Sequence, residues 1–269
     1  RGVIYDRKDR KIAWNGAVFQ IIAEEKNGKD VILDELKNWT EAEEKKKQFE
    51  QEGVYGYVRI EPSSVRAYSE NPGLAHVLGY VGRPSEKDLA GGKVPLEQLV
   101  GKEGLEKYYD SILQGTSGLR LLERDSKGNI ISENIQKEPE PGNKVALSID
   151  SAVQSQMFSS IKHVAETYGY KGGAGVIMDI STGEIISLSS YPEYDPNVLT
   201  AGQPAETITK YFQDKNRPFL NRAISGLYAP GSIIKPAMAL AALNEKIISP
   251  EKQILSTGSI FLPTPFFPD

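Results

Sequence analysis

A dense cluster of breaker residues divides this chain near its middle. Residues 138–142 read EPEPG, and prolines and glycines so closely spaced end regular secondary structure. With 269 residues, the chain is long enough for two domains of ordinary size. We therefore predict an α+β protein with one module over residues 1–140 and a second over residues 141–269.

The first module is predicted to be rich in β-structure. Residues 1–13 read as two short extended pieces around a charged turn, and residues 16–33 alternate as a strand pair that turns at Asn27-Gly28. Further segments complete the module: a strand at 54–60, a hairpin over 118–137 that turns at 126–129, a charged helix over 34–52 and an amphipathic helix within 101–115 that a glycine ends.

The second module is predicted to begin with a strand, a helix and a hairpin. The strand covers residues 145–150 and ends at Asp150, and the helix then runs to about Tyr168. A hairpin follows, with strands at 174–179 and 184–189, and a proline-punctuated loop covers 190–197.

A serine at the start of an apolar run is the main candidate for chemistry. Residues 228–236 read YAPGSIIKP, so Pro230 and Gly231 form a turn before Ser232, and Lys235 falls on the same helical face. A serine hydroxyl becomes a nucleophile when a nearby base takes its proton, and an amine can act as that base. Since the run from 232 to 243 is nearly all apolar, we expect this helix to be largely buried. A buried lysine is costly, which also suggests that Lys235 has a function.

The spacing alone does not prove catalysis, because Ser232 is also a plausible helix cap. The same Ser-x-x-Lys spacing occurs at two other places. Ser159 and Lys162 lie within a polar periodic segment and are interpreted as a solvated helix face. Ser249, followed by a proline and a glutamate, is interpreted as a helix cap.

Composition excludes several other functions. The net charge is -4, which argues against nucleic acid as a partner. There is no cysteine, so thiolate chemistry and disulfides are absent. The two histidines, His76 and His163, are too few for a histidine-rich metal site, and we interpret both as structural or exposed. We predict no cofactor and no metal.

Several motifs together resemble class B penicillin-binding proteins. The serine motif at 228–236 resembles the active-serine motif of these peptidoglycan D,D-transpeptidases, which β-lactams acylate. Residues 1–7 (RGVIYDR) resemble the start of the extracytoplasmic part of the family, and residues 101–115 (GKEGLEKYYDSILQG) resemble a long signature of its N-terminal pedestal or dimerisation-type module. The motifs occur in the order that the family has.

The resemblance implies a function and its residues. Ser232 would be the nucleophile and Lys235 the general base of a serine acyl-enzyme that cross-links stem peptides. The particular residues of these motifs favour the elongation (cell-shape) branch, which implies a glycosyltransferase partner in the membrane. The resemblance also implies a location on the extracytoplasmic face of the bacterial cytoplasmic membrane, with a single N-terminal anchor outside this chain.

Two further family motifs, S-x-N and K-T/S-G, do not occur after Lys235. Three upstream matches in spelling, at 69–71, 132–134 and 171–173, lie outside the expected places and are interpreted as coincidental. The chain is therefore interpreted as the N-terminal module plus the first part of a transpeptidase domain, without a competent active site by itself. A β-lactamase or β-lactam sensor, and a non-catalytic scaffold that binds cell-wall synthesis partners, remain as alternatives.

Overall fold

The structure, a computed structural model, describes residues 1–24, 30–55, 57–89, 98–124 and 130–253, together with Leu255 and Gly258. The chain forms two compact units, Arg1–Gly226 and Leu227–Asp269. Each unit is described by itself. Within the described residues no helix is both long and apolar enough to span a membrane.

A five-stranded sheet in the first unit is built around one long strand. Strand β2 (Lys11–Glu24) pairs in antiparallel fashion with β1 (Ile4–Tyr5), β3 (Asp30–Leu36) and β4 (Tyr57–Tyr68). Strand β1 also pairs in parallel with β9 (Val145–Ala146), which comes from the other side of the breaker cluster. The predicted extended segments within 1–13 and the strand pair within 16–33 are thus confirmed, whereas the Asn27-Gly28 turn lies outside the described residues. The strand predicted at 54–60 forms as β4, but it begins at Tyr57 and continues to Tyr68.

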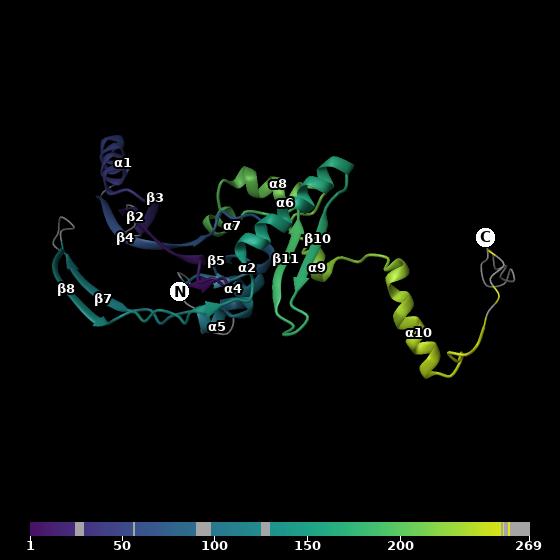
Figure 1. Ribbon diagram of the computed structural model, residues 1–269. Coiled ribbons are helices and arrows are strands. Elements are labelled where there is room, and N and C mark those ends of the chain that lie inside the picture. Colours follow the sequence, from purple (N-terminus) through teal and green to yellow (C-terminus); the bar gives the residue numbers. More distant parts are fainter. Residues whose placement is uncertain are drawn as a thin grey trace. The chain divides into compact units, whose positions relative to one another are not determined.

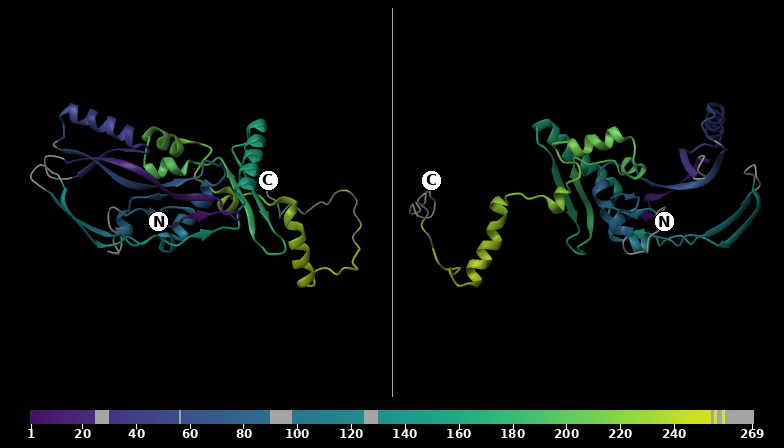
Figure 2. Two further views of the ribbon diagram at one scale, coloured as in Figure 1. Left: turned by 60° about the vertical axis from the view of Figure 1, so that its left-hand side comes forward. Right: turned by 180° about the vertical axis from the view of Figure 1, so that it is seen from behind.

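Helix α1 (Trp39–Glu52) covers the far end of this sheet, as both views of Figure 2 show. Its start is later than predicted, because β3 extends to Leu36 and Asn38 then caps the helix by accepting a hydrogen bond from the Thr40 N–H. Ala42 is its buried residue, and Phe49 packs against the cluster formed by Ile21, Ala23 and Val58. The charged face is exposed, as its sequence predicts.

Short elements form the rest of the first module. They are α2 (Ala75–Leu78), β5 (Val81–Gly82), α3 (Glu86–Leu89), β6 (Val100–Gly101), α4 (Gly104–Tyr108) and α5 (Asp110–Leu113). The single helix predicted within 101–115 is wrong, because β6 occupies its first residue and Tyr109 leaves helical geometry between α4 and α5. Glu106 explains part of this shape, since two arginines bind its fully buried carboxylate and hold α4 in place.

The predicted hairpin within 118–137 is confirmed. Strand β7 (Leu119–Arg124) pairs with β8 (Ile130–Lys137) in an antiparallel arm, and the predicted turn at 126–129 lies outside the described residues. Figure 1 shows this arm in teal, separate from the strands of the five-stranded sheet.

The region after the breaker begins as predicted, except that β9 is only two residues long. Asp150 caps α6 (Ser151–Tyr168) by accepting from the Ala152 and Val153 N–H groups, and Gly169 ends the helix. Helix α6 packs on the antiparallel pair β10 (Gly173–Met178) and β11 (Ile185–Tyr191), as Figure 1 shows. Three helices follow: α7 (Pro196–Ala201), α8 (Ala205–Gln213) and α9 (Arg222–Ser225).

The main core of the first unit contains residues from both sides of the breaker. Ile149 and the partly buried Ile185 pack with residues of the first module. The buried members from that module are Ile4, Ile12, Ala13, Tyr68, Leu74, Leu78 and Leu113. Residues 1–140 and 141–226 therefore share one hydrophobic core. We call the contacts between these two parts the junction.

Candidate active site

Ser232 lies in a short 3₁₀ helix, η1 (Gly231–Ile234), and α10 (Lys235–Asn244) follows without a gap. Gly231 has a φ of 57°, a left-handed conformation that side chains rarely adopt, so the Pro-Gly turn has a physical reason. The Lys235 N–H donates to the Ser232 carbonyl. Because residues three apart are eclipsed in a 3₁₀ helix, this geometry puts Ser232 and Lys235 on one side of the segment.

The expected burial of this helix is wrong. Ser232, Lys235 and all of α10 except the partly exposed Ala242 are exposed, and Leu240 keeps 69% of its surface. Among the described residues, neither Ser232 nor Lys235 has a side-chain hydrogen bond or ion pair. The reason is that an apolar run is buried only where another element covers it, and the second unit supplies no such element among its described residues. The cost of burial is therefore no argument for a role of Lys235 in this structure.

Arg222 fixes the chain shortly before the serine motif. Its side chain is 7% exposed, its backbone N–H donates to Ser190 Oγ at 2.9 Å, and Ser190 in turn donates to the Leu220 carbonyl. The guanidinium donates to the carbonyls of Arg217, Leu220 and Asn216. Arginine satisfies several carbonyls at once because its planar fork carries five donors. Nothing in the sequence pattern indicated these contacts of Arg222.

The other two Ser-x-x-Lys pairs differ from the first. Ser159 and Lys162 lie on the exposed face of α6, and Lys162 pairs with Glu166, as the interpretation of a solvated face predicts. The helix cap predicted at Ser249 is wrong: the Lys252 N–H donates to the Ser249 carbonyl in a turn, and no helix follows within the described residues. A turn forms because no regular apolar pattern follows to stabilise a helix.

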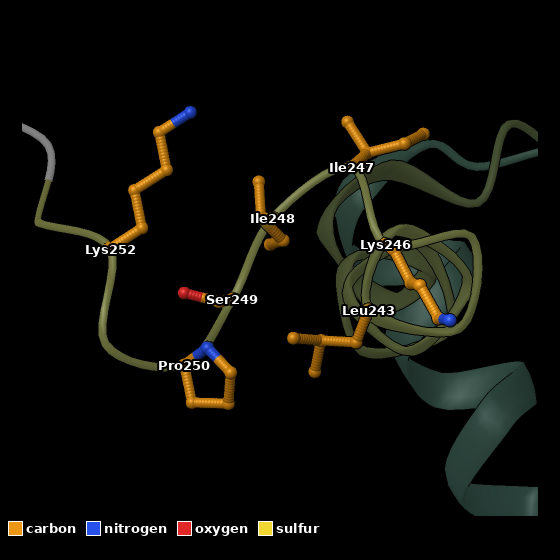
Figure 3. A pocket seen from close by; sticks show the side chains of 7 residues that line it. All are labelled: Leu243, Lys246, Ile247, Ile248, Ser249, Pro250 and Lys252. Carbon is orange, nitrogen blue, oxygen red and sulfur yellow. The ribbon is translucent and has the colours of Figure 1, made fainter.

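A groove of the second unit lies at the opposite end of α10 from Ser232. Figure 3 shows its lining side chains, and the Lys252 amine points away from the Ser249 hydroxyl there. The lining residues are Leu243, Lys246, Ile247, Ile248, Ser249, Pro250 and Lys252. The groove includes neither Ser232 nor Lys235, so it does not belong to the candidate site.

The histidines fit the structural interpretation. His76 is buried in α2 and its Nε2 lies 2.8 Å from the Pro218 carbonyl, while His163 is exposed on α6. Burial, helped by the nearby Arg222 and opposed by the Pro218 carbonyl, lowers the pKa of His76 to about 4. His76 is therefore neutral at physiological pH. In the part of the chain that the structure describes, no group of three or more potential metal ligands is found.

Comparison with known families matches both parts of the chain. Residues 36–147 match the penicillin-binding protein dimerisation domain, and residues 173–264 match the penicillin-binding protein transpeptidase domain. The second match includes Ser232 and Lys235.

Individual relatives agree. The chain is 30% identical to the peptidoglycan D,D-transpeptidase MrdA of Haemophilus influenzae, in an alignment that covers 98% of this chain and 45% of that protein. The complex between penicillin-binding protein PBP2 and MreC from Helicobacter pylori has a chain with a TM-score of 0.74 and 25% identity, covering 98% of this chain and 54% of that one.

A second solved structure concerns the coordination of polymerization and crosslinking by a peptidoglycan synthase complex. It has a TM-score of 0.69 and 26% identity, and covers 94% of this chain and 48% of that one. This chain thus spans about half the length of the relatives that it matches. With the dimerisation domain followed by the transpeptidase domain, and the serine motif inside the latter, the chain belongs to the class B penicillin-binding proteins.

Proposed function

We propose that this chain is part of a peptidoglycan D,D-transpeptidase in which Ser232 is the nucleophile and Lys235 the general base. The observation that carries the proposal is the position of both residues at the start of a helix inside the segment that matches the transpeptidase domain. No cofactor or metal takes part in the proposed chemistry.

The proposed reaction has two steps. Ser232 Oγ forms a bond to the penultimate D-Ala carbonyl carbon of a stem peptide, and its proton passes to Lys235 Nζ. The terminal D-Ala leaves as an amine with that proton. An amine of a neighbouring stem peptide then attacks the ester, which makes the cross-link and returns the proton to Ser232. Backbone N–H groups at the N-terminal end of η1 can stabilise the oxyanion that forms in each step.

β-Lactams would enter the same chemistry. Attack of Ser232 on the ring carbonyl opens the ring, so the leaving amine stays attached to the acyl group and the ester persists. This is why the serine of a transpeptidase can be labelled by a penicillin.

We place the protein in the elongation branch of the family, on the extracytoplasmic face of the cytoplasmic membrane, with a membrane anchor before Arg1. The residues of the motifs and the similarity to MrdA support the elongation branch. A glycosyltransferase partner in the membrane is supported by the structural likeness to a complex for polymerization and crosslinking. We also propose the domain boundary at 140/141, between a pedestal module and a partial transpeptidase domain.

Intact-mass spectrometry after incubation with benzylpenicillin tests the assignment of Ser232. In the full-length protein, the wild type is expected to gain one stable adduct and Ser232→Ala none. Ser159→Ala and Ser249→Ala are matched controls, since both serines have the same spacing to a lysine, and both variants should be labelled like the wild type.

The alternatives give different results. A folded wild type without any adduct would contradict the enzyme and favour a non-catalytic scaffold. An adduct that forms and is quickly hydrolysed would favour a β-lactamase, and a stable adduct without transpeptidation of stem peptides would favour a β-lactam sensor.

A further inference from the structure

Among the carboxylates that bridge the two sides of the junction, Asp6 and Glu193 stand in contrasting surroundings. Asp6, in the turn after β1, binds Ser151 at the start of α6. Glu193, in the loop after β11, binds the backbone of the turn before α2. Their surroundings differ in charge, and this difference has consequences for the behaviour of the junction.

The negative charge of the Asp6 carboxylate is balanced by an arginine and several hydrogen-bond donors. Arg10 Nε donates to its carboxylate at 2.8 Å, Ser151 donates through its hydroxyl at 2.7 Å and its N–H at 3.1 Å, and the Lys8 and Arg10 N–H groups donate at 2.9 Å. Burial alone raises the pKa of Asp6, but these hydrogen bonds outweigh it and lower the pKa to about 2. Asp6 is therefore ionised at any physiological pH.

Glu193 has two donors and no counter-ion. Its two oxygens accept from the Gly73 N–H at 2.6 Å and the Ala75 N–H at 3.1 Å. Within the described residues no lysine, arginine or histidine forms an ion pair with it, and the carboxylate of Asp195 lies on the same loop. Gly73 has a φ of 92° and a Cβ there would lie 2.8 Å from the Phe158 Cβ, so this position of the turn requires glycine.

We propose that Glu193 makes the junction sensitive to protons: the contact between its loop and the 73–75 turn is tightest when Glu193 is protonated, and it opens more readily once Glu193 is ionised. The reason is that closing the contact removes a charge from water with only two neutral donors to replace the solvent. When the contact opens, water solvates the carboxylate.

Glu193 changes its protonation state close to neutral pH. Burial raises its pKa to about 7, the repulsion from Asp195 adds to this effect, and the two N–H bonds only partly oppose it. An acid whose pKa is higher in the closed state binds its proton more tightly there. Closing is therefore favoured at low pH, becomes weaker as the pH rises from about 5 to about 7, and changes little above that value.

Other titratable groups around Glu193 do not titrate in this range. His76 on α2 stays neutral, because burial lowers its pKa to about 4. The hydroxyl of Tyr194, next in the loop, donates to the Ala75 carbonyl at 3.2 Å, and burial raises the pKa of this hydroxyl. Asp6 remains ionised. The response is thus assigned to Glu193 itself.

Amide hydrogen exchange of the full chain, read residue by residue and corrected for the intrinsic rate at each pH, tests the proposal. Between pH 5 and 7 the protection of the Gly73 and Ala75 amides should fall by up to about tenfold per pH unit, and then level off. The Ser151 amide, which donates to Asp6, is the internal control and should keep constant protection.

Two variants identify the group. Glu193→Gln removes the titration and should make the protection of both amides independent of pH. Asp195→Asn keeps a capping side chain for α7, because asparagine is also a good N-cap, and removes only the repulsion, so the levelling-off point should move to lower pH. The proposal is overturned if the wild-type protection at Gly73 and Ala75 is constant or rises between pH 5 and 7, or if Glu193→Gln keeps the wild-type slope.

Discussion

In residues 1–226 polar side chains are buried and hydrogen-bonded, whereas from Leu227 onward none of the described residues is buried. Gln154 illustrates the first region. It is fully buried, its oxygen accepts from Ser187 and from the Leu188 N–H, and its nitrogen donates to the Gly73 and Leu188 carbonyls. The serine segment illustrates the second, because local signals alone shape it. The difference teaches that a turn and a helix start can form from neighbouring residues, while burial needs a partner element.

The largest expected effect is the loss of acylation rate when Lys235 is removed from the exposed serine segment. In the full-length protein, Lys235→Ala should slow acylation by benzylpenicillin by about 10²–10⁴-fold, because a general base is lost. Stopped-flow or quenched mass spectrometry measures the rate. Lys252→Ala removes another exposed lysine at the same spacing from a serine, and it should leave the rate unchanged. If both variants slowed acylation equally, Lys235 would have no specific role as the general base.

Glu106→Gln probes a fully buried charge of the first unit. Its carboxylate is fully buried and accepts from Arg1 Nε and Arg66 Nε, each at 2.6 Å. Arg1 keeps its ion pair with Asp110, but among the described residues the buried Arg66 guanidinium loses its carboxylate partner, so the free energy of unfolding should fall by about 3–5 kcal/mol. Denaturant unfolding followed by circular dichroism measures it. Glu206→Gln, in the exposed pair with Lys210, is the control and should change little.

A buried and an exposed leucine test how much burial contributes to stability in the two regions. Leu78→Ala should lower the free energy of unfolding by about 2–5 kcal/mol, because Leu78 is fully buried and its loss leaves a cavity. Leu240→Ala on α10 should change it by less than about 0.5 kcal/mol. Both variants remove the same atoms, so thermal and denaturant unfolding of the two compare the regions directly. A large loss for Leu240→Ala would mean that α10 is covered in solution.

The smallest expected effect is the loss of stability at acidic pH that Asp6 contributes. The pKa of Asp6 is lower in the folded chain than in the unfolded chain, so Asp6 stabilises the fold above about pH 4, and this contribution of about 1–2 kcal/mol is lost as the pH falls towards 2. Denaturant titrations between pH 2 and 5 should show a shallower pH dependence for Asp6→Asn than for the wild type. Parallel curves would assign the acid sensitivity to other carboxylates.

Elements with local signals were predictable from the sequence. Asp150 and Gly169 bound α6 at nearly the expected positions, and the pair β10–β11 forms across the expected turn. These features depend on capping and on alternation, which act between residues close in sequence. For the same reason the turn at Gly231 and the start of α10 near Ser232 were predictable.

Features that depend on distant residues were not predictable. The contacts of Glu106 on α4 with Arg1 and Arg66 join residues that are far apart in the chain. Helix α7 was missed because the prolines at its start indicate a loop, and α8 was missed although it is amphipathic, since it is only nine residues long. Glu193 reads as an ordinary loop residue, and only the fold brings it to the Gly73 turn.

The pairing of β1 with β9 has a consequence for how the molecule is made. Ile4 lies beside Val145 in the sheet, so about half of the chain separates the two partners. On a ribosome, the first strand is synthesised early and has to wait until the residues beyond the breaker emerge. The N-terminal sheet thus stays open during much of translation, and contacts of such long range form slowly. A fragment cut at residue 140 would remain in that unfinished state.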